Sequence, residues 1–208
     1  PAVIAARIAR AGLRFRPGVD VEVVDPESDA RYRDYWNDYQ RLMGRHGVTP
    51  DMAKALLRRS TTTIGAMMVR RGDADAMLCG LVGRFDVHLG HVRDVIGLKP
   101  GATTLATLNA LMLPQHTIFV TDTIVNEEPT AEELAEIAAM AAVEVRRFGL
   151  PPKVAFLSHS MFGSSDRPSA RRMRRAHKLF AAACPDVECD GEMHGDAALS
   201  EEVRRTFL

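Results

Sequence analysis

In the second half of the sequence, short apolar runs alternate with longer segments of helical pattern, and this alternation limits the folds open to the chain. The run TIFVTD at residues 117–122 is rich in β-branched and aromatic residues, which is typical of a strand. Residues 130–149 then carry apolar side chains at helical spacing and begin with TAEE, the pattern of a capping box. A strand at residues 154–158, an arginine-rich helix and a last strand near residues 187–192 follow. This order predicts an α/β fold with a largely parallel sheet covered by helices.

The first half of the sequence predicts the same kind of structure with more helix. Residues 19–25, VDVEVVD, form a β-rich run that stops at a proline, which predicts a short strand. Residues 29–47 and 50–71 each carry helical periodicity and predict two helices. The run ADAMLCG at residues 74–80 predicts a buried parallel strand, and residues 83–98 predict a helix that Lys-Pro-Gly ends.

Composition excludes several classes of protein. The 27 basic and 27 acidic residues balance, so bulk charge suggests neither a nucleic-acid nor a membrane partner. The apolar runs are shorter than the ~20 residues of a membrane helix and no leader opens the chain, so we expect a cytoplasmic protein. The three cysteines lack CxxC spacing and are expected to be reduced thiols. The chain starts without methionine and ends just after a strand, so we expect a fragment of a longer protein.

The carboxyl ends of the predicted strands are the first place to seek a ligand. In open parallel sheets, loops at these ends converge with helix N-termini that carry unpaired N–H donors. Several of the ends are rich in small or hydroxyl-bearing residues. They are GLVGR at residues 80–84, DTIVN at 122–126, SHSMFGSS at 158–165 and DGE at 190–192.

The loop at residues 158–165 has two interpretations. Gly163 allows a ligand to approach the backbone, and Ser164 and Ser165 add hydroxyl donors near the positive end of a helix. The alternative is an ordinary turn from strand to helix with Asp166 as N-cap, since neither GxGxxG nor GxxxxGK[ST] is present. The pattern leaves both open.

The cationic and histidine side chains near the strand ends are equally ambiguous. Arg84 and Arg93 either bind an anion or pair with nearby aspartates. Arginines 171, 172, 174 and 175 follow the serine-containing loop and could bind phosphates, but a solvated helix face is the preferred interpretation, because adjacent positions cannot all point at one ligand. His88 and His91 are three residues apart but lack a carboxylate partner in pattern, so no metal site is predicted. His159 stands at a strand end, where proton chemistry or a surface role are alternatives.

Four blocks together carry a resemblance to a known family. They are ADAMLCGLVGRFDVHLGHVRDVIGLKPG, TDTIVNEEPTAEELAEIAAMAAVEVRRFG, KVAFLSHSMFGSSDRPSARRMRRA and DGEMHGDAAL. They resemble the phosphate acetyltransferase (phosphotransacetylase) family, and more narrowly the acetyltransferase-like C-terminal region of bacterial hybrid NADP-dependent malic enzymes. The segments YRDYWNDYQRLMGRHGVTP and GRFDVHLGHVRDVIGL point to the hybrid enzymes.

The resemblance implies a fold and a division of the chain. The family fold is a three-layer α/β/α arrangement of mostly parallel sheets in two subdomains with a cleft, like that of isocitrate and isopropylmalate dehydrogenases. Residues 1–109 would form part of the first subdomain and residues 110–208 the second.

The resemblance also implies a set of ligand-binding residues. Arg93 matches a phosphate-binding arginine, and the loop with Ser158, Ser160, Gly163, Ser164 and Ser165 matches the SxSxxGS loop of the cleft. These residues would bind acetyl-CoA or phosphate. Four further positions form a candidate pocket: Arg84, Thr123, Asn126 and His159.

Departures from the family pattern concern catalysis. Thr123 stands where free-standing transferases usually carry a cysteine, and Gly83-Arg84-Phe85 replaces a histidine-threonine pair. The family's catalytic serine-arginine and aspartate belong to a C-terminal segment without a counterpart here. No catalytic residue is therefore assigned in this chain.

Three functions remain in competition. The first is a regulatory module of a hybrid malic enzyme that binds acetyl-CoA and supports a homo-oligomer of at least two chains. The second is an active transferase that moves an acetyl group between acetyl phosphate and coenzyme A, and the third is an oligomerisation scaffold without ligand. No cofactor is expected within this chain, because the glycine fingerprint of nicotinamide sites is missing after the first strand; NADP and a divalent metal would belong to the malic domain.

Overall fold

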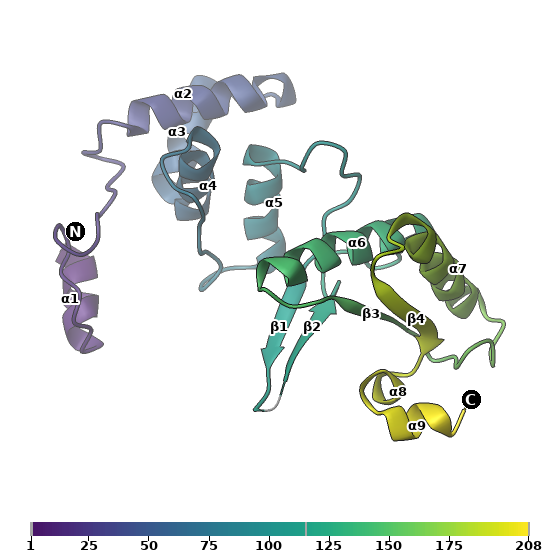
Figure 1. The fold of residues 1–208 in the computed structure, drawn as a ribbon. Helices are drawn as coiled ribbons and strands as arrows, with labels where there is room; N and C mark the ends of the chain where they lie inside the picture. Colours follow the sequence, from purple (N-terminus) through teal and green to yellow (C-terminus); the bar gives the residue numbers. More distant parts are fainter. Residues whose placement is uncertain (1, 115, 208) are drawn as a thin grey trace. The chain divides into compact units, whose positions relative to one another are not determined.

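A computed structural model describes residues 2–114 and 116–207 of the chain (Figure 1). The chain consists of two compact units, residues 1–97 and residues 98–208. The implied subdomain boundary after Asn109 stays a prediction. Among the described residues, no helix combines the length and the apolar character that a membrane span requires.

Among the described residues of the first unit, the regular elements are helices. Its helices begin with α1, a short amphipathic helix without buried residues. Four α-helices and one 3-10 helix follow at the predicted helical segments. The elements are α1 (Ala2–Arg10), α2 (Tyr32–Met43), η1 (Gly44–His46), α3 (Pro50–Arg59), α4 (Thr61–Arg71) and α5 (Phe85–Val95).

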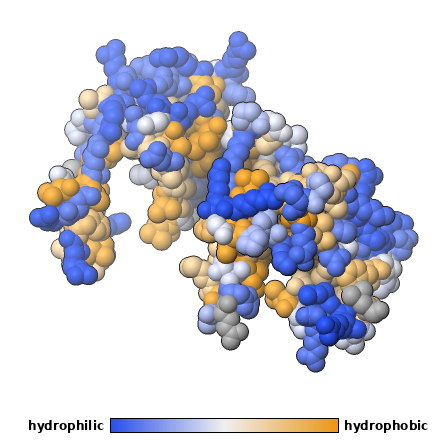
Figure 2. Space-filling view, viewed as in Figure 1, coloured by the Kyte–Doolittle hydropathy of each residue, from blue (hydrophilic) through white to orange (hydrophobic). Residues whose placement is uncertain are grey.

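Two predicted strands of the first unit are wrong. Residues 19–25 form no strand; Val21 makes an isolated bridge to Pro17, outside this range. Residues 74–80 form no strand either. A strand is stable only when another strand accepts its hydrogen bonds, and neither run finds one among the described residues. Leu78 is consequently fully exposed rather than buried. Apolar surface of this kind is visible between hydrophilic areas on the face shown in Figure 2.

The predicted helix at residues 50–71 is divided at Ser60. The extended backbone of Ser60 ends α3, and its side chain accepts from the N–H of Thr63 as the N-cap of α4. Serine competes with the helical backbone in this way and favours caps over helix interiors. The division lets both helices contribute to one core.

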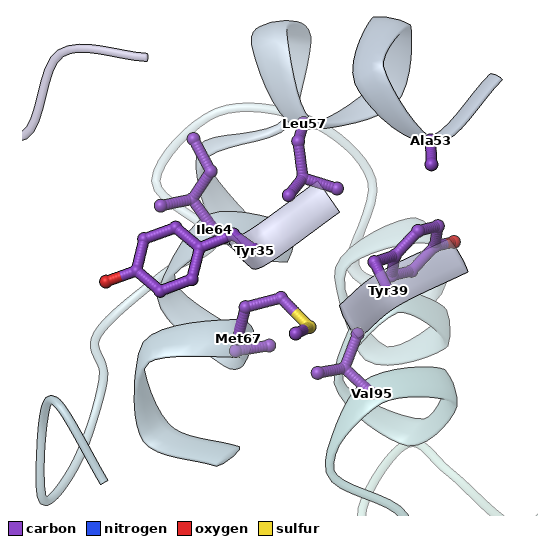
Figure 3. Packing of buried hydrophobic residues seen from close by; sticks show 8 residues of the cluster. Tyr35, Tyr39, Ala53, Leu57, Ile64, Met67 and Val95 are labelled. Carbon is purple, nitrogen blue, oxygen red and sulfur yellow. The ribbon is translucent and has the colours of Figure 1, made fainter. Parts of the chain in front are cut away.

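The core of the first unit is formed by α2 to α5. Tyr35 and Tyr39 of α2, Met67 of α4 and Val95 of α5 are almost completely buried. Figure 3 shows these side chains gathered in one region, with Met67 and Val95 beside the two tyrosines. The aromatic spacing that predicted α2 is therefore the spacing of its buried face.

The second unit is an α/β structure, which confirms the predicted class. Strands β1 and β2 form an antiparallel pair, and β3 and β4 form a parallel pair. Helices α6 and α7 contact each other and both contact β3 (Figure 1). The elements are β1 (Leu108–Met112), β2 (Thr117–Thr121), α6 (Ala131–Arg147), β3 (Lys153–Leu157), α7 (Pro168–Ala183), β4 (Glu188–Met193), α8 (Gly195–Leu199) and α9 (Glu201–Arg205).

The predicted order of strands is correct for β3, α7 and β4 but not for β2. The segments β3, α7 and β4 form a parallel strand-helix-strand unit, as the alternation indicated. In contrast, β2 pairs with β1, a strand that the pattern did not predict, and the pair is antiparallel. Only four residues separate the two strands, and a connection of that length suits a hairpin rather than a parallel crossover.

The core of the second unit lies between α6, α7 and the β3–β4 pair. Small residues of α6, such as Ala135 and Ala142, let α7 approach closely, and Phe156 of β3 and Phe180 of α7 fill the space beside them. The two rings lie 5.7 Å apart, centroid to centroid, at a tilted angle. The predicted capping box is present: Glu133 N–H donates to Thr130 Oγ1 (3.2 Å) and Thr130 N–H donates to Glu133 Oε2 (2.7 Å).

Candidate functional site in the loop between β3 and α7

The predicted ligand loop, residues 158–165, connects β3 to α7 and is called the serine loop below. It turns sharply because Phe162 and Gly163 both have positive φ angles, 44° and 94°. Glycine adopts such angles without strain, whereas phenylalanine rarely does. The surrounding contacts must therefore hold this conformation.

A buried carboxylate holds the serine loop in place. Glu192 of β4 is only 1% exposed, and its Oε1 accepts from Ser160 Oγ (2.6 Å) and from the Gly163 N–H (2.9 Å). The backbone carbonyl of Glu192 also accepts from the Phe162 N–H (2.9 Å). The last strand of the second unit thus fastens the loop that follows β3.

Arg174 of α7 neutralises this carboxylate. Its Nη1 donates to Glu192 Oε1 (2.8 Å) and to the backbone carbonyl of Ser165 (2.9 Å), and its Nη2 donates to Asp166 Oδ1 (3.1 Å). The side chain of Arg174 is about one quarter exposed. The interpretation of Arg174 as part of a solvated helix face is therefore wrong, because one turn of α7 directs it at the loop.

Hydrogen bonds from the loop keep Glu192 ionised. Burial by itself would raise the pKa of Glu192, but the hydrogen bonds from Ser160, Gly163 and Arg174 outweigh it and lower the pKa below its ordinary value of 4.5. The Glu192 carboxylate is consequently ionised near neutral pH.

The backbone of the serine loop is occupied by its own hydrogen bonds. Except for His159, every residue of the loop donates its backbone N–H to an acceptor within the described part of the chain. The acceptors are Met193 O for Ser158, Ser158 Oγ for Ser160, Ser164 Oγ for Met161, Glu192 O for Phe162, Glu192 Oε1 for Gly163, Met161 O for Ser164 and Ser160 Oγ for Ser165. The loop therefore does not present a row of free N–H groups to an anion, and side chains must make any ligand contact.

Side chains at the rim of the loop remain accessible. Ser160 is completely buried, whereas Ser164 and His159 are exposed and Ser165 is half-buried. His159 Nε2 lies 3.4 Å from Ser165 Oγ, and the backbone carbonyl of His159 lies 3.0 Å from His194 Nε2. The predicted set thus divides into internal supports, among them Ser158 and Ser160, and outward groups, which are His159, Ser164 and Ser165.

The predicted pocket residues Thr123 and Asn126 belong to a second network, in the loop after β2. Asp122 Oδ2 accepts from the N–H (2.8 Å) and Nδ2 (2.6 Å) of Asn126, and its Oδ1 accepts from Thr107 Oγ1 (2.9 Å). Thr123 Oγ1 donates to Asn109 Oδ1 (2.8 Å) and is exposed. Asn126 is thus a support of the loop after β2, and Thr123 is the accessible hydroxyl.

Asp122 makes the second unit sensitive to acid. Burial alone would raise the pKa of Asp122, but hydrogen bonds from Asn126 and Thr107 lower it below its ordinary value of 3.8. A lowered pKa stabilises the fold fully above the unfolded value and loses that effect as pH falls through the folded value. We therefore expect Asp122→Asn to reduce thermal stability at pH 7 and the difference from wild type to shrink below pH ~4. Thermal unfolding of the variant and of wild type at pH 7 and below pH ~4 measures this difference, with Asp190→Asn as the control. An equal difference between variant and wild type at the two pH values would contradict the prediction.

Arg84 and Arg93 belong to the first unit, in and beside α5. Arg84 is 80% exposed in its side chain and pairs with Asp86 (2.7 Å), and Arg93 is 68% exposed with Asp94 at 3.9 Å. Both arginines thus lie near aspartates, and their role as anion-binding residues stays a prediction. Such exposed pairs are weak and leave both guanidinium groups accessible.

Pattern analysis missed the charged groups that hold the two candidate loops. Glu192 and Arg174 hold the serine loop and Asp122 holds the loop after β2, yet the sequence predicts none of them as a site residue. Glu192 was visible only as a carboxylate at a strand end, in the run DGE. Among residues 2–114 and 116–207, no group of three or more metal-ligating side chains comes together.

Comparison with known proteins identifies the family. The model of the family described as phosphate acetyl/butaryl transferase matches residues 2–208. The chain is 52% identical to an NADP-dependent malic enzyme of Escherichia coli (strain K12) over 98% of its length, and 29% identical over 99% to a phosphate acetyltransferase of Nitratidesulfovibrio vulgaris. It spans only 27% and 29% of the lengths of these two proteins.

Solved structures agree with this assignment. A phosphotransacetylase from Streptococcus pyogenes matches with a TM-score of 0.80 and 26% identity, over 97% of this chain and 60% of that one. The match of the family model to almost every residue and the shared fold lead to one conclusion. The chain belongs to the phosphate acetyl/butaryl transferase family.

Proposed function

We propose that this chain is the phosphate acetyltransferase-like region of a cytoplasmic hybrid malic enzyme, and that it binds acetyl-CoA as a regulatory and oligomerisation module. The observation that carries the proposal is the contrast in similarity. Identity is 52% to a malic enzyme but 29% to a phosphate acetyltransferase, each over nearly the whole chain. The chain covers about a quarter of the malic enzyme, which leaves room there for a separate catalytic domain.

The outward groups of the serine loop support a binding role. The hydroxyls of Ser164 and Ser165 and the imidazole of His159 are hydrogen-bonding groups on a loop whose backbone is fixed. A fixed loop loses little conformational entropy when a ligand binds. In this proposal these groups contact the acyl-thioester end of acetyl-CoA. The exposed guanidinium groups of Arg84 and Arg93, in the first unit, are proposed separately as phosphate-binding groups.

Regulation requires that acetyl-CoA favour one global state of the parent enzyme over another. The malic reaction, with its NADP and divalent metal, then takes place in the domain outside these residues. Acetyl-CoA bound here changes the activity of that domain through contacts between domains or between subunits. The effect disappears in the parent enzyme when this region is removed.

A second candidate is an active phosphate acyltransferase. Membership of the family and the shared fold favour it. Thr123, which stands in place of the usual cysteine and donates its hydroxyl to Asn109, counts against it. Formation of acetyl-CoA from acetyl phosphate and coenzyme A by the parent enzyme distinguishes this candidate.

Calorimetric titration with acetyl-CoA tests the proposal. We expect saturable binding to the chain, weakened about tenfold in Ser165→Ala, which removes a hydroxyl donor. Ser169→Ala on the first turn of α7 is the matched control, since its side chain is exposed and lies outside the candidate groups. Equal affinity in both variants would contradict the assigned contact, and no heat from the chain or from its parent enzyme would contradict the function.

A further inference from the structure

We infer that Glu192 is the positioning residue of the serine loop, and that ligand affinity at Ser165 depends on the Glu192 charge although Glu192 touches no ligand. This inference rests on the proposed function for its binding part. Its structural part stands on the contacts of Glu192 alone.

Two routes connect Glu192 with Ser165. In the first, Glu192 Oε1 accepts from Ser160 Oγ (2.6 Å), which orients that hydroxyl so that its oxygen accepts from the Ser165 N–H (3.1 Å). In the second, Glu192 Oε1 binds Arg174 Nη1 (2.8 Å), which also donates to the Ser165 carbonyl (2.9 Å). Both ends of the Ser165 backbone are therefore held by groups that Glu192 orients.

A third contact fixes the middle of the loop. Glu192 Oε1 accepts from the N–H of Gly163, whose φ of 94° makes the reversal that brings Ser164 and Ser165 back beside Ser160. Phe162, with a φ of 44°, is the costly neighbour that this contact helps to maintain. Hydrogen bonds to a carboxylate are roughly twice as strong as neutral ones, so the charge itself supports the strained turn.

The burial of Glu192 makes this role specific. Its side chain is 1% exposed, and its second oxygen, Oε2, is buried without a hydrogen-bond partner in the described part of the chain. A residue that served only as a partner for Arg174 would need no such burial, because an exposed pair suffices for that contact. The donors from Ser160, Gly163 and Arg174 all bind Glu192 Oε1. This convergence is expected of a carboxylate that positions the loop.

The test compares individual amides and ligand affinity in Glu192→Gln. The glutamine keeps the shape and one acceptor oxygen but removes the charge. We expect hydrogen exchange of the Gly163 and Ser165 amides, followed by NMR in the ligand-free chain, to accelerate about tenfold or more, and acetyl-CoA affinity to fall by a similar factor. Glu188→Gln is the matched control, because Glu188 lies on the same strand, is exposed and pairs with the exposed Lys153.

A second variant keeps the inference testable if Glu192→Gln folds poorly. Ser160→Ala removes the first route only, so the Ser165 amide is expected to exchange faster while the Gly163 amide keeps its protection. Phe180→Leu, in the core away from the loop, serves as a control for a general loss of stability. We expect it to leave the ratio of the exchange rates of the Gly163 and Ser165 amides unchanged, and the acetyl-CoA affinity unchanged as well.

The outcomes separate the inference from the proposed function. Unchanged exchange at both amides in Glu192→Gln overturns the positioning role, whatever the ligand result. Faster exchange with unchanged affinity overturns the link from Glu192 to the ligand. Absence of acetyl-CoA binding in the wild-type chain overturns the binding part, and the exchange pattern then decides the positioning role by itself.

Discussion

Replacement of Glu192 by alanine is expected to lower the free energy of unfolding of the second unit by about 3–5 kcal/mol. The substitution leaves the Arg174 guanidinium without its buried partner and removes the acceptor of Ser160 Oγ and of the Gly163 N–H. Breaking one half of a buried ion pair is more damaging than never having formed it, because a desolvated charge remains. The pair is only partly shielded on the arginine side, so the lower end of the range is expected.

Urea unfolding, monitored through amide hydrogen exchange of residues 153–193, measures this loss of unfolding free energy. Glu188→Ala on the same strand is the control, since its ion pair with Lys153 is exposed on both sides and worth at most ~1 kcal/mol. A loss for Glu192→Ala no larger than that of the control would show that the buried network contributes little to stability.

Phe180→Ala is expected to destabilise the same unit by about 3–5 kcal/mol. Phe180 is completely buried on α7, where its ring packs against Phe156 in the cluster that joins α6, α7 and β3. The truncation removes apolar area from the core and leaves a cavity that the helices cannot close, because helix packing and strand pairing fix their separation.

The same unfolding measurement serves here with a different control. Phe148 at the end of α6 is 65% exposed, so Phe148→Ala removes a ring that water already contacts. We expect it to cost no more than ~1 kcal/mol. Similar losses for the two phenylalanines would mean that the core cluster is not the centre of stability of this unit.

Helices α2 to α7 followed from local pattern because a helix satisfies its own backbone, whereas α1, α8 and α9 were not predicted. The TAEE capping box and the apolar spacing of α6 act within a few residues, and both appear as predicted. The strands are different, because each needs a partner elsewhere in the chain. Residues 153–157 find one in β4, whereas the equally strand-like residues 19–25 and 74–80 find none among the described residues.

The candidate site was predictable in location but not in construction. The position of the serine loop follows from the rule that ligands gather at the carboxyl ends of parallel strands, and the loop does follow β3. Its supports were not predictable: Glu192 and Arg174 lie on elements after the loop, and their roles depend on which way their side chains point. Arg171, Arg174 and Arg175 look alike in the sequence, yet among them only Arg174 reaches the buried carboxylate.

The sequence by itself determined helices α2 to α7, the β3–α7–β4 alternation, the location of the serine loop and the resemblance to the phosphate acetyltransferase family. These features depend on local spacing or on the identity of residues in blocks. Only the tertiary structure decided which strands pair, which loop hydroxyls are buried, and which carboxylate supports the turn. These depend on contacts between residues such as Ser160 and Glu192, 32 positions apart. Burial and hydrogen-bond partners depend on the three-dimensional arrangement of residues, so the order of residues along the chain does not reveal them.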